Sequence, residues 1–75
     1  MKNEEYIKEF GTHLKKLRKS KKFSQQYLAD ISEVHLKTIQ RIERNKLNPT
    51  LDVLYSIAQG FNITVSNLLD FPFND

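Results

Sequence analysis

The chain contains no cysteine, which excludes both a disulfide framework and a thiolate-ligated metal site. It has no apolar stretch close to the roughly 20 residues of a membrane-spanning helix, and no signal-peptide pattern at its start. We therefore expect a cytoplasmic protein whose stability comes from side-chain packing, helped by a second subunit. With 75 residues, of which 39% are hydrophobic and 28% charged, the chain suffices for one compact globular domain.

Glycine and proline are scarce, with two residues of each, and the alternating pattern typical of β-strands is absent. Apolar residues instead recur at intervals of three and four, as in Ile7, Phe10, Leu14 and Leu17. Residues that commonly cap helices precede several such stretches, namely Asn3, Ser24, Thr50 and Thr64. The sequence predicts an all-α single domain over residues 1–75. Its five helices are expected at about residues 4–20, 24–31, 35–44, 50–60 and 64–70.

Charge is distributed unevenly along the chain, whose formal net charge is +3. Residues 1–46 contain all 12 Lys and Arg residues, whereas residues 47–75 contain three Asp and no basic residue. The basic residues are densest between Lys15 and Lys22, a segment without any acid. This distribution is typical of a surface that binds a polyanion, although a solvated helix face would explain the run equally well.

The helix predicted at residues 35–44 has two chemically different faces. With Leu36 at 0°, the angles of Gln40, Arg44, Lys37 and Arg41 are about 40°, 80°, 100° and 140°. Ile42 and Ile39 lie on the opposite side, at about 240° and 300°. Lys, Arg and Gln side chains can reach base edges in the major groove of DNA, and a leucine can contact a thymine methyl group. A plain solvated face is the alternative for any single amphipathic helix.

Two short helices joined by a turn of three or four residues are typical of the helix-turn-helix, whose second helix enters the major groove. The sequence resembles the Cro/repressor-type (XRE-like) helix-turn-helix family from about residue 10 to residue 69. The resemblance rests on LKKLR (14–18), SQQYLA (24–29), Val34 with IQRIERN (39–45), NPTL (48–51) and IA (57–58). It implies a compact five-helix, lambda-repressor-like domain that regulates transcription by sequence-specific DNA binding.

The resemblance also implies roles for individual residues. Leu36, Lys37 and Arg41 match base-reading positions, with Gln40 beside them. Gln25, Arg44, Asn45, Lys46 and Asn48 are expected to contact the DNA backbone, and Gln25 is also expected to brace the helix at residues 35–44. We also expect His35 to begin or cap the helix at residues 35–44 and to contact a phosphate. Arg18 and Glu43 match an internal ion pair of the family and are expected to be structural.

The composition of residues 47–75 suggests how the protein assembles. This segment has no positive charge and ends in Leu68, Leu69, Phe71 and Phe73. A contiguous apolar cluster usually marks a contact surface, and the resemblance implies dimer contacts in this region. We expect a homodimer on a two-fold symmetric operator, with dimer contacts at Leu68, Phe71, Phe61 and Asn62. The alternative is that Phe71 and Phe73 fold back onto their own subunit.

Two residues stand where the family often has glycine. Glu33 lies in the turn before the helix at residues 35–44, and a left-handed backbone there would cost on the order of 1 kcal/mol. We expect this turn to be strained or differently shaped. Asn45 follows the same helix, and asparagine tolerates the left-handed conformation well.

Other function classes fit the residues less well. The two histidines, His13 and His35, lack further ligands at metal-binding spacing, so we expect no metal or other cofactor. No nucleophile–base pair and no glycine-rich phosphate loop is present, and a domain of this size leaves little room for a catalytic pocket, so we expect no enzyme. A membrane-surface role for Lys15 to Lys22 would need the apolar residues that the core requires.

The serious alternative to a plain regulator is an antitoxin-type module that binds a toxin and its own operator. A regulator without an attached effector domain is expected to act by occupancy, either by blocking polymerase or by contacting it.

Overall fold

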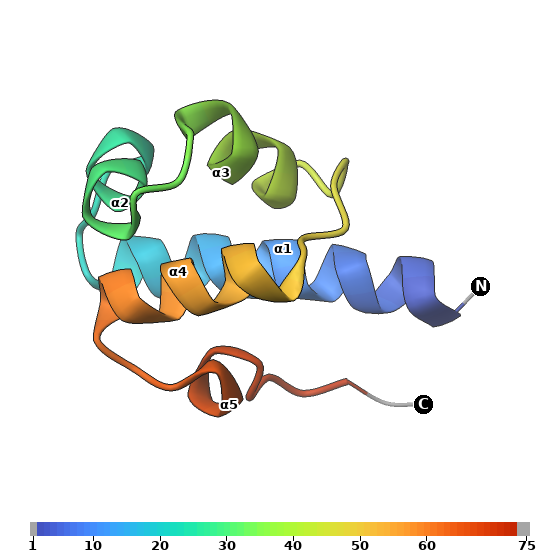
Figure 1. Ribbon diagram of the computed structural model, residues 1–75. Helices are drawn as coiled ribbons and strands as arrows, with labels where there is room; N and C mark the ends of the chain where they lie inside the picture. The colour runs from blue at the N-terminus through green and yellow to red at the C-terminus, as the bar shows by residue number, and fades with distance from the viewer. Residues whose placement is uncertain (1, 74–75) are drawn as a thin grey trace.

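The structure is a computed structural model that describes residues 2–73. Its helices are α1 (Lys2–Ser20), α2 (Gln25–Ser32), α3 (Leu36–Glu43), α4 (Leu51–Phe61) and α5 (Val65–Leu68) (Figure 1). No strand is present among these residues, so the expected all-α fold with five helices is confirmed. α1 begins two residues earlier than expected, and α5 ends at Leu68 rather than at residue 70. The remaining helix ends lie within one residue of the expected positions.

Side-chain caps determine where three of the helices begin. The hydroxyl groups of Ser24, Thr50 and Thr64 each accept a hydrogen bond from the backbone N–H three residues further on, at 3.0, 3.2 and 3.0 Å. Each cap satisfies one of the N–H groups that have no partner inside the helix. α3 begins differently, because its N-cap residue His35 makes no side-chain capping hydrogen bond. His35 therefore precedes the helix without capping it through its ring.

The hydrophobic core receives residues from all five helices. Its buried members are Phe10, Leu14, Leu28, Ala29, Ile39, Ile42, Ile57, Ala58, Phe61 and Leu68. α2 packs against both α3 and α4, α1 packs against α3, and α4 packs against α5. In Figure 1, α2 and α3 lie above α1 and α4, while α5 lies below them. This arrangement leaves the side of α3 that faces away from the core open to solvent.

α1 approaches α3 closely at Gly11. A Cβ atom at this position would collide with the carbonyl oxygen of Ile42 and with the side-chain oxygen of Asn45. The carbonyl belongs to the helical backbone and cannot move aside as a flexible side chain can. Gly11 therefore sets how closely α1 lies to the end of α3.

The C-terminal residues fold onto α1 of the same chain. The ring centroid of Phe71 lies 5.0 Å from that of Tyr6 and 5.1 Å from that of His13. The ring centroid of Phe73 lies 5.0 Å from that of Tyr6 in an edge-to-face arrangement. Both phenylalanines are half-buried by these contacts. The structure thus follows the fold-back alternative for Phe71 and Phe73.

Two of the four residues expected at a dimer contact belong to the core instead. Leu68 is 0% exposed and Phe61 is 6% exposed, so neither side chain is available to a second subunit. The expectation for these two residues is corrected: the short α5 carries Leu68 inward, and α4 carries Phe61 inward at its last turn. Asn62 is exposed and Phe71 is half-buried, so these two remain accessible.

Candidate nucleic-acid interface

The turn between α2 and α3 is held in a strained conformation at Glu33. This residue has φ 56° and ψ 40°, so the turn is left-handed and strained, the first of the two alternatives expected for it. Its N–H donates to the carbonyl oxygen of Asp30 at 3.3 Å, and the N–H of Val34 donates to that of Ala29 at 3.0 Å. These bonds satisfy carbonyl groups at the end of α2. They hold the turn in a conformation that costs about 1 kcal/mol or more for a residue other than glycine.

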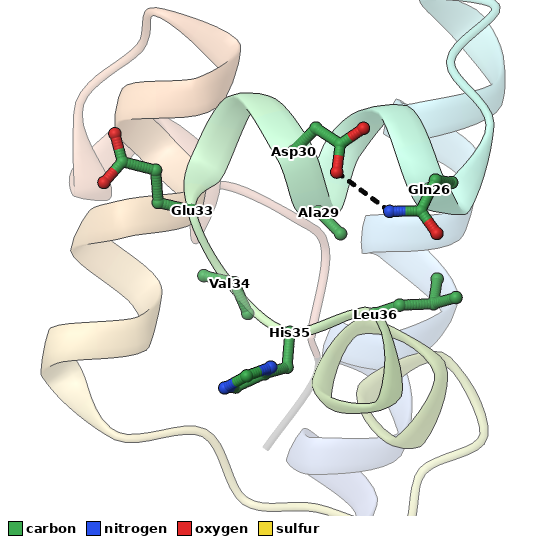
Figure 2. A pocket seen from close by; sticks show the side chains of 7 residues that line it. All are labelled: Gln26, Ala29, Asp30, Glu33, Val34, His35 and Leu36. Atoms are coloured by element: carbon green, nitrogen blue, oxygen red, sulfur yellow. Dashed lines mark hydrogen bonds between the residues drawn. The ribbon is translucent and has the colours of Figure 1, made fainter.

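A shallow hollow of about 370 Å³ lies between α2 and the beginning of α3 (Figure 2). It is lined by Gln26, Ala29, Asp30, Glu33, Val34, His35 and Leu36. Figure 2 shows the Glu33 carboxylate pointing away from the other lining side chains. The Asp30 carboxylate accepts a hydrogen bond from the Gln26 amide at 2.8 Å, one helical turn away. Both acidic residues are exposed, so the hollow contains no buried unpaired charge.

The solvent-facing side of α3 gathers the four residues expected to read bases. An open hollow of about 560 Å³ on this side is lined by His35, Leu36, Lys37, Thr38, Gln40 and Arg41. Lys37 and Arg41 are exposed, whereas Leu36 and Gln40 are half-buried. On the opposite side, Ile39 and Ile42 are buried in the core. The fold thus keeps one face of α3 in contact with the protein and leaves its long polar side chains outside.

A buried ion pair fastens the end of α3 to α1. Nε of Arg18 lies 2.7 Å from Oε2 of Glu43, and Nη2 donates to Oε1 at 3.0 Å. The two side chains are only 9% and 3% exposed. Nη1 of Arg18 also donates to the carbonyl oxygen of Phe23 at 2.8 Å. Arg18 therefore links α1, the turn before α2 and α3 through charge-assisted hydrogen bonds.

Gln25 joins the same network. It is the first residue of α2, and its Nε2 donates to Oε1 of Glu43 at 3.0 Å. The N–H groups at the N-terminus of a helix favour a bound phosphate, and the hydrogen bond fixes the Gln25 amide close to them. The bond braces α3 as the family resemblance implied, and the structure identifies its partner as Glu43, 18 residues further along the chain.

The loop after α3 carries four further residues expected to contact the DNA backbone, namely Arg44, Asn45, Lys46 and Asn48. All four are exposed. Asn45 has φ 64°, so it adopts the left-handed conformation without the cost that Glu33 incurs. A hollow of about 370 Å³ joins this loop to α1 and is lined by Glu4, Ile7, Lys8, Asn45, Lys46, Leu47 and Asn48. Lys8 could not be singled out from the sequence, because its position beside the loop depends on how α1 and α3 pack.

Within residues 2–73, no group of three or more His, Cys, Asp and Glu side chains could hold a metal ion. The two histidines lie in different surroundings: His13 stacks on Phe71, and His35 precedes α3. None of the helices in the described part of the chain is long and apolar enough to cross a membrane.

Comparison with known proteins agrees with this geometry. A family model described as helix-turn-helix matches residues 14–68, which include all of α2, α3, α4 and α5. The chain belongs to the Cro/repressor-type helix-turn-helix family. This is a family of DNA-binding regulators and not of enzymes.

The HTH-type transcriptional regulator SutR of Escherichia coli (strain K12) is similar to this helix-turn-helix chain. The two are 36% identical over 62 residues, which make up 83% of this chain and 35% of SutR. The chain therefore spans about a third of the length of that protein. No solved structure gives a match.

Proposed function

We propose that this helix-turn-helix chain is a sequence-specific transcriptional regulator that acts in the cytoplasm and reads its operator with α3. The observation that carries the proposal is the common surface of Leu36, Lys37, Gln40 and Arg41 on the solvent-facing side of that helix. Arg and Lys donate to guanine, Gln pairs with adenine, and a leucine contacts the thymine methyl group. SutR is named as a transcriptional regulator, which supports the same role for the matched segment of this chain.

Phosphate contacts on both sides of α3 would set the register of this helix on DNA. The residues proposed to make these contacts are Gln25, His35, Arg44, Asn45, Lys46 and Asn48. His35 precedes α3, Gln25 is bonded to its last residue, and the other four follow it. Contacts of this kind fix orientation without carrying sequence information, so base discrimination rests on the outer side of α3.

The proposed regulator binds as a homodimer to an operator with two-fold symmetry. One recognition helix reads only a few base pairs, whereas two helices about 34 Å apart can read two successive major grooves on one side of B-DNA. Asn62 and Phe71 stay accessible in the C-terminal half. Leu51 and Tyr55, which are 72% and 55% exposed and lie one turn apart in α4, add an apolar surface there. We include these four residues in the proposed dimer contact.

Selection of binding sites from a random pool of DNA duplexes tests the function. The wild type is expected to enrich two inverted half-sites whose centres are about 10 base pairs or a multiple of that apart. Lys37→Ala and Arg41→Ala are each expected to cost about 1–3 kcal/mol of specific binding and to relax one base position per half-site. Unchanged preference in both variants would show that α3 is not the reading helix. Enrichment of single half-sites would contradict the dimer alone.

A further inference from the structure

α1 carries three lysines on the side that faces the end of α3, and the proposed function does not use them. With Leu14 at 0° on a helical wheel, Lys15, Lys8 and Lys19 lie at about 100°, 120° and 140°. We call these three residues the lysine stripe. All of them are exposed, and none has a salt-bridge partner in the part of the chain that the structure describes.

Gly11 locates the lysine stripe relative to the proposed DNA-binding surface. On the same wheel Gly11 lies at about 60°, between the stripe and the core. Lys8 and Lys15 are its neighbours on the helix surface, three residues before it and four residues after it. A Cβ atom added at Gly11 would collide with the carbonyl group of Ile42 and the side chain of Asn45, so this side of α1 lies directly against the end of α3. The stripe therefore runs beside the last turn of α3 and the loop that follows it.

The end of the stripe at Lys8 adjoins residues already proposed to contact the DNA backbone. Lys8 lines one hollow together with Asn45, Lys46 and Asn48. Lys15 lies one helical turn before Arg18, which is bonded to Glu43, and Glu43 is bonded in turn to Gln25. The stripe thus starts beside the loop after α3 and runs along α1 towards Arg18, which Glu43 links to the beginning of α2.

Few acidic groups oppose this positive charge. Glu5 and Glu9 lie at about 180° and 220° on the wheel, on another side of α1. Glu4, at about 80°, lies one turn before Lys8 and offsets part of its charge. The carboxylate of Glu43 is paired with Arg18. Lys15 and Lys19 therefore carry most of the unopposed charge of the stripe.

We infer that the lysine stripe binds backbone phosphates of the operator beside the bases read by α3. This inference rests on the proposed function and extends its contact surface to a helix outside the helix-turn-helix. The stripe covers about 16 Å along α1, while phosphates of one strand of B-DNA recur about every 3.4 Å of the duplex axis. Such contacts add affinity and salt dependence without changing base preference.

Phosphate-by-phosphate replacement tests the inference directly. Each phosphate of the selected operator is replaced in turn by an uncharged methylphosphonate, and affinity is measured for the wild type, Lys15→Gln, Lys19→Gln and Lys16→Gln. Lys16 is the matched control, because it is an exposed lysine on the same helix at about 200°. For each of the two stripe lysines we expect at least one phosphate whose replacement weakens DNA binding by the wild type and by Lys16→Gln. The same replacement should not weaken binding by the variant that lacks the lysine in contact with that phosphate.

The salt dependence of binding gives a second measurement that needs no operator. On any B-DNA duplex, Lys15→Gln/Lys19→Gln is expected to reduce the slope of log affinity against log salt by up to about 1.8, since each phosphate contact contributes about 0.9. Lys16→Gln is expected to leave the slope nearly unchanged. Thermal melting confirms that the variants, which change only exposed side chains, are folded.

Two outcomes would overturn the inference. In the first, the double variant has the same slope of log affinity against log salt as Lys16→Gln, and no phosphate replacement affects the wild type more than the Lys15 or Lys19 variants. In the second, the double variant loses binding to anionic phospholipid vesicles while its DNA slope stays at the wild-type value. Failure of the proposed function would give another result. The wild type would show no sequence preference, although the stripe variants would still reduce the slope of log affinity against log salt. A wild type that binds no duplex overturns both.

Discussion

Arg18 holds Glu43 through two hydrogen bonds, of 2.7 and 3.0 Å, so that the last residue of α3 is fixed to α1. Neither side chain is free to contact DNA, because both are almost completely buried. α3 contains only eight residues, so a constraint at its end also restricts the angle of its outer side. The orientation of the proposed reading surface is thus set by charges that the DNA does not meet.

Glu43→Ala is expected to lower the free energy of unfolding by about 3 kcal/mol, because the Arg18 guanidinium would lose its partner while it remains buried. Base preference should change little. The measurements are urea unfolding and binding-site selection. Replacing both partners, as in Arg18→Met/Glu43→Leu, should recover much of the lost stability, because no buried charge is then left unpaired. A stable Glu43→Ala protein with a new sequence preference would contradict this role.

Glu33→Gly is expected to raise the free energy of unfolding by about 0.5–1 kcal/mol. Glycine removes the cost of the left-handed backbone, about 1–2 kcal/mol, and part of this gain is offset by the greater freedom of glycine in the unfolded chain. Glu33→Ala is the matched control, since alanine keeps the backbone cost and also lacks the carboxylate. Urea unfolding of the two variants decides the question. Equal stability of the glycine and alanine variants would show that the turn stores no strain.

Lys46→Ala is expected to weaken binding to all DNA sequences by a similar factor. Its exposed ammonium group follows α3 and carries charge but no base discrimination. The slope of log affinity against log salt should decrease by about 0.9. Asn45→Ala and Asn48→Ala serve as controls, since neutral hydrogen bonds leave that slope nearly unchanged. A loss confined to one operator base would contradict a phosphate contact.

Leu51→Asp/Tyr55→Asp is expected to shift a dimer towards monomer in sedimentation experiments. Both side chains are exposed in the single chain, so the charges disturb a contact between subunits and leave the core intact. Phe71→Asp should lower thermal stability as well as association, because Phe71 packs on Tyr6 and His13 and also belongs to the proposed dimer contact. Equal association of the wild type and the α4 double variant would show that this surface is not the dimer contact.

The helices could be predicted because their signals are local. Ser24, Thr50 and Thr64 stand directly before helices that they cap. The outer side of α3 could be predicted for the same reason, because the residues of each face recur at intervals of three or four along the chain. For Glu33, the resemblance to the family left two alternatives open, a strained turn or a turn of different shape, and the structure shows the left-handed, strained one.

Local signals could not predict whether the C-terminal apolar residues are buried in the core or exposed to a second subunit. Leu68 occurs in an apolar run that would serve equally well in a core or in a subunit contact. Only tertiary packing decides between these two, and it buries Leu68 completely. The position of Lys8 beside Lys46 has the same origin, because these residues are brought together by the packing of α1 on α3.

The close approach at Gly11 has a consequence for how this protein tolerates mutation. A single added methyl group there would push the last turn of α3 away from α1, since it would collide with the Ile42 carbonyl group. That shift would alter the height of the base-reading side chains relative to the lysines of α1, although Gly11 itself is buried. A position that no DNA atom can reach therefore acts as the spacer between two surfaces that must meet one duplex together.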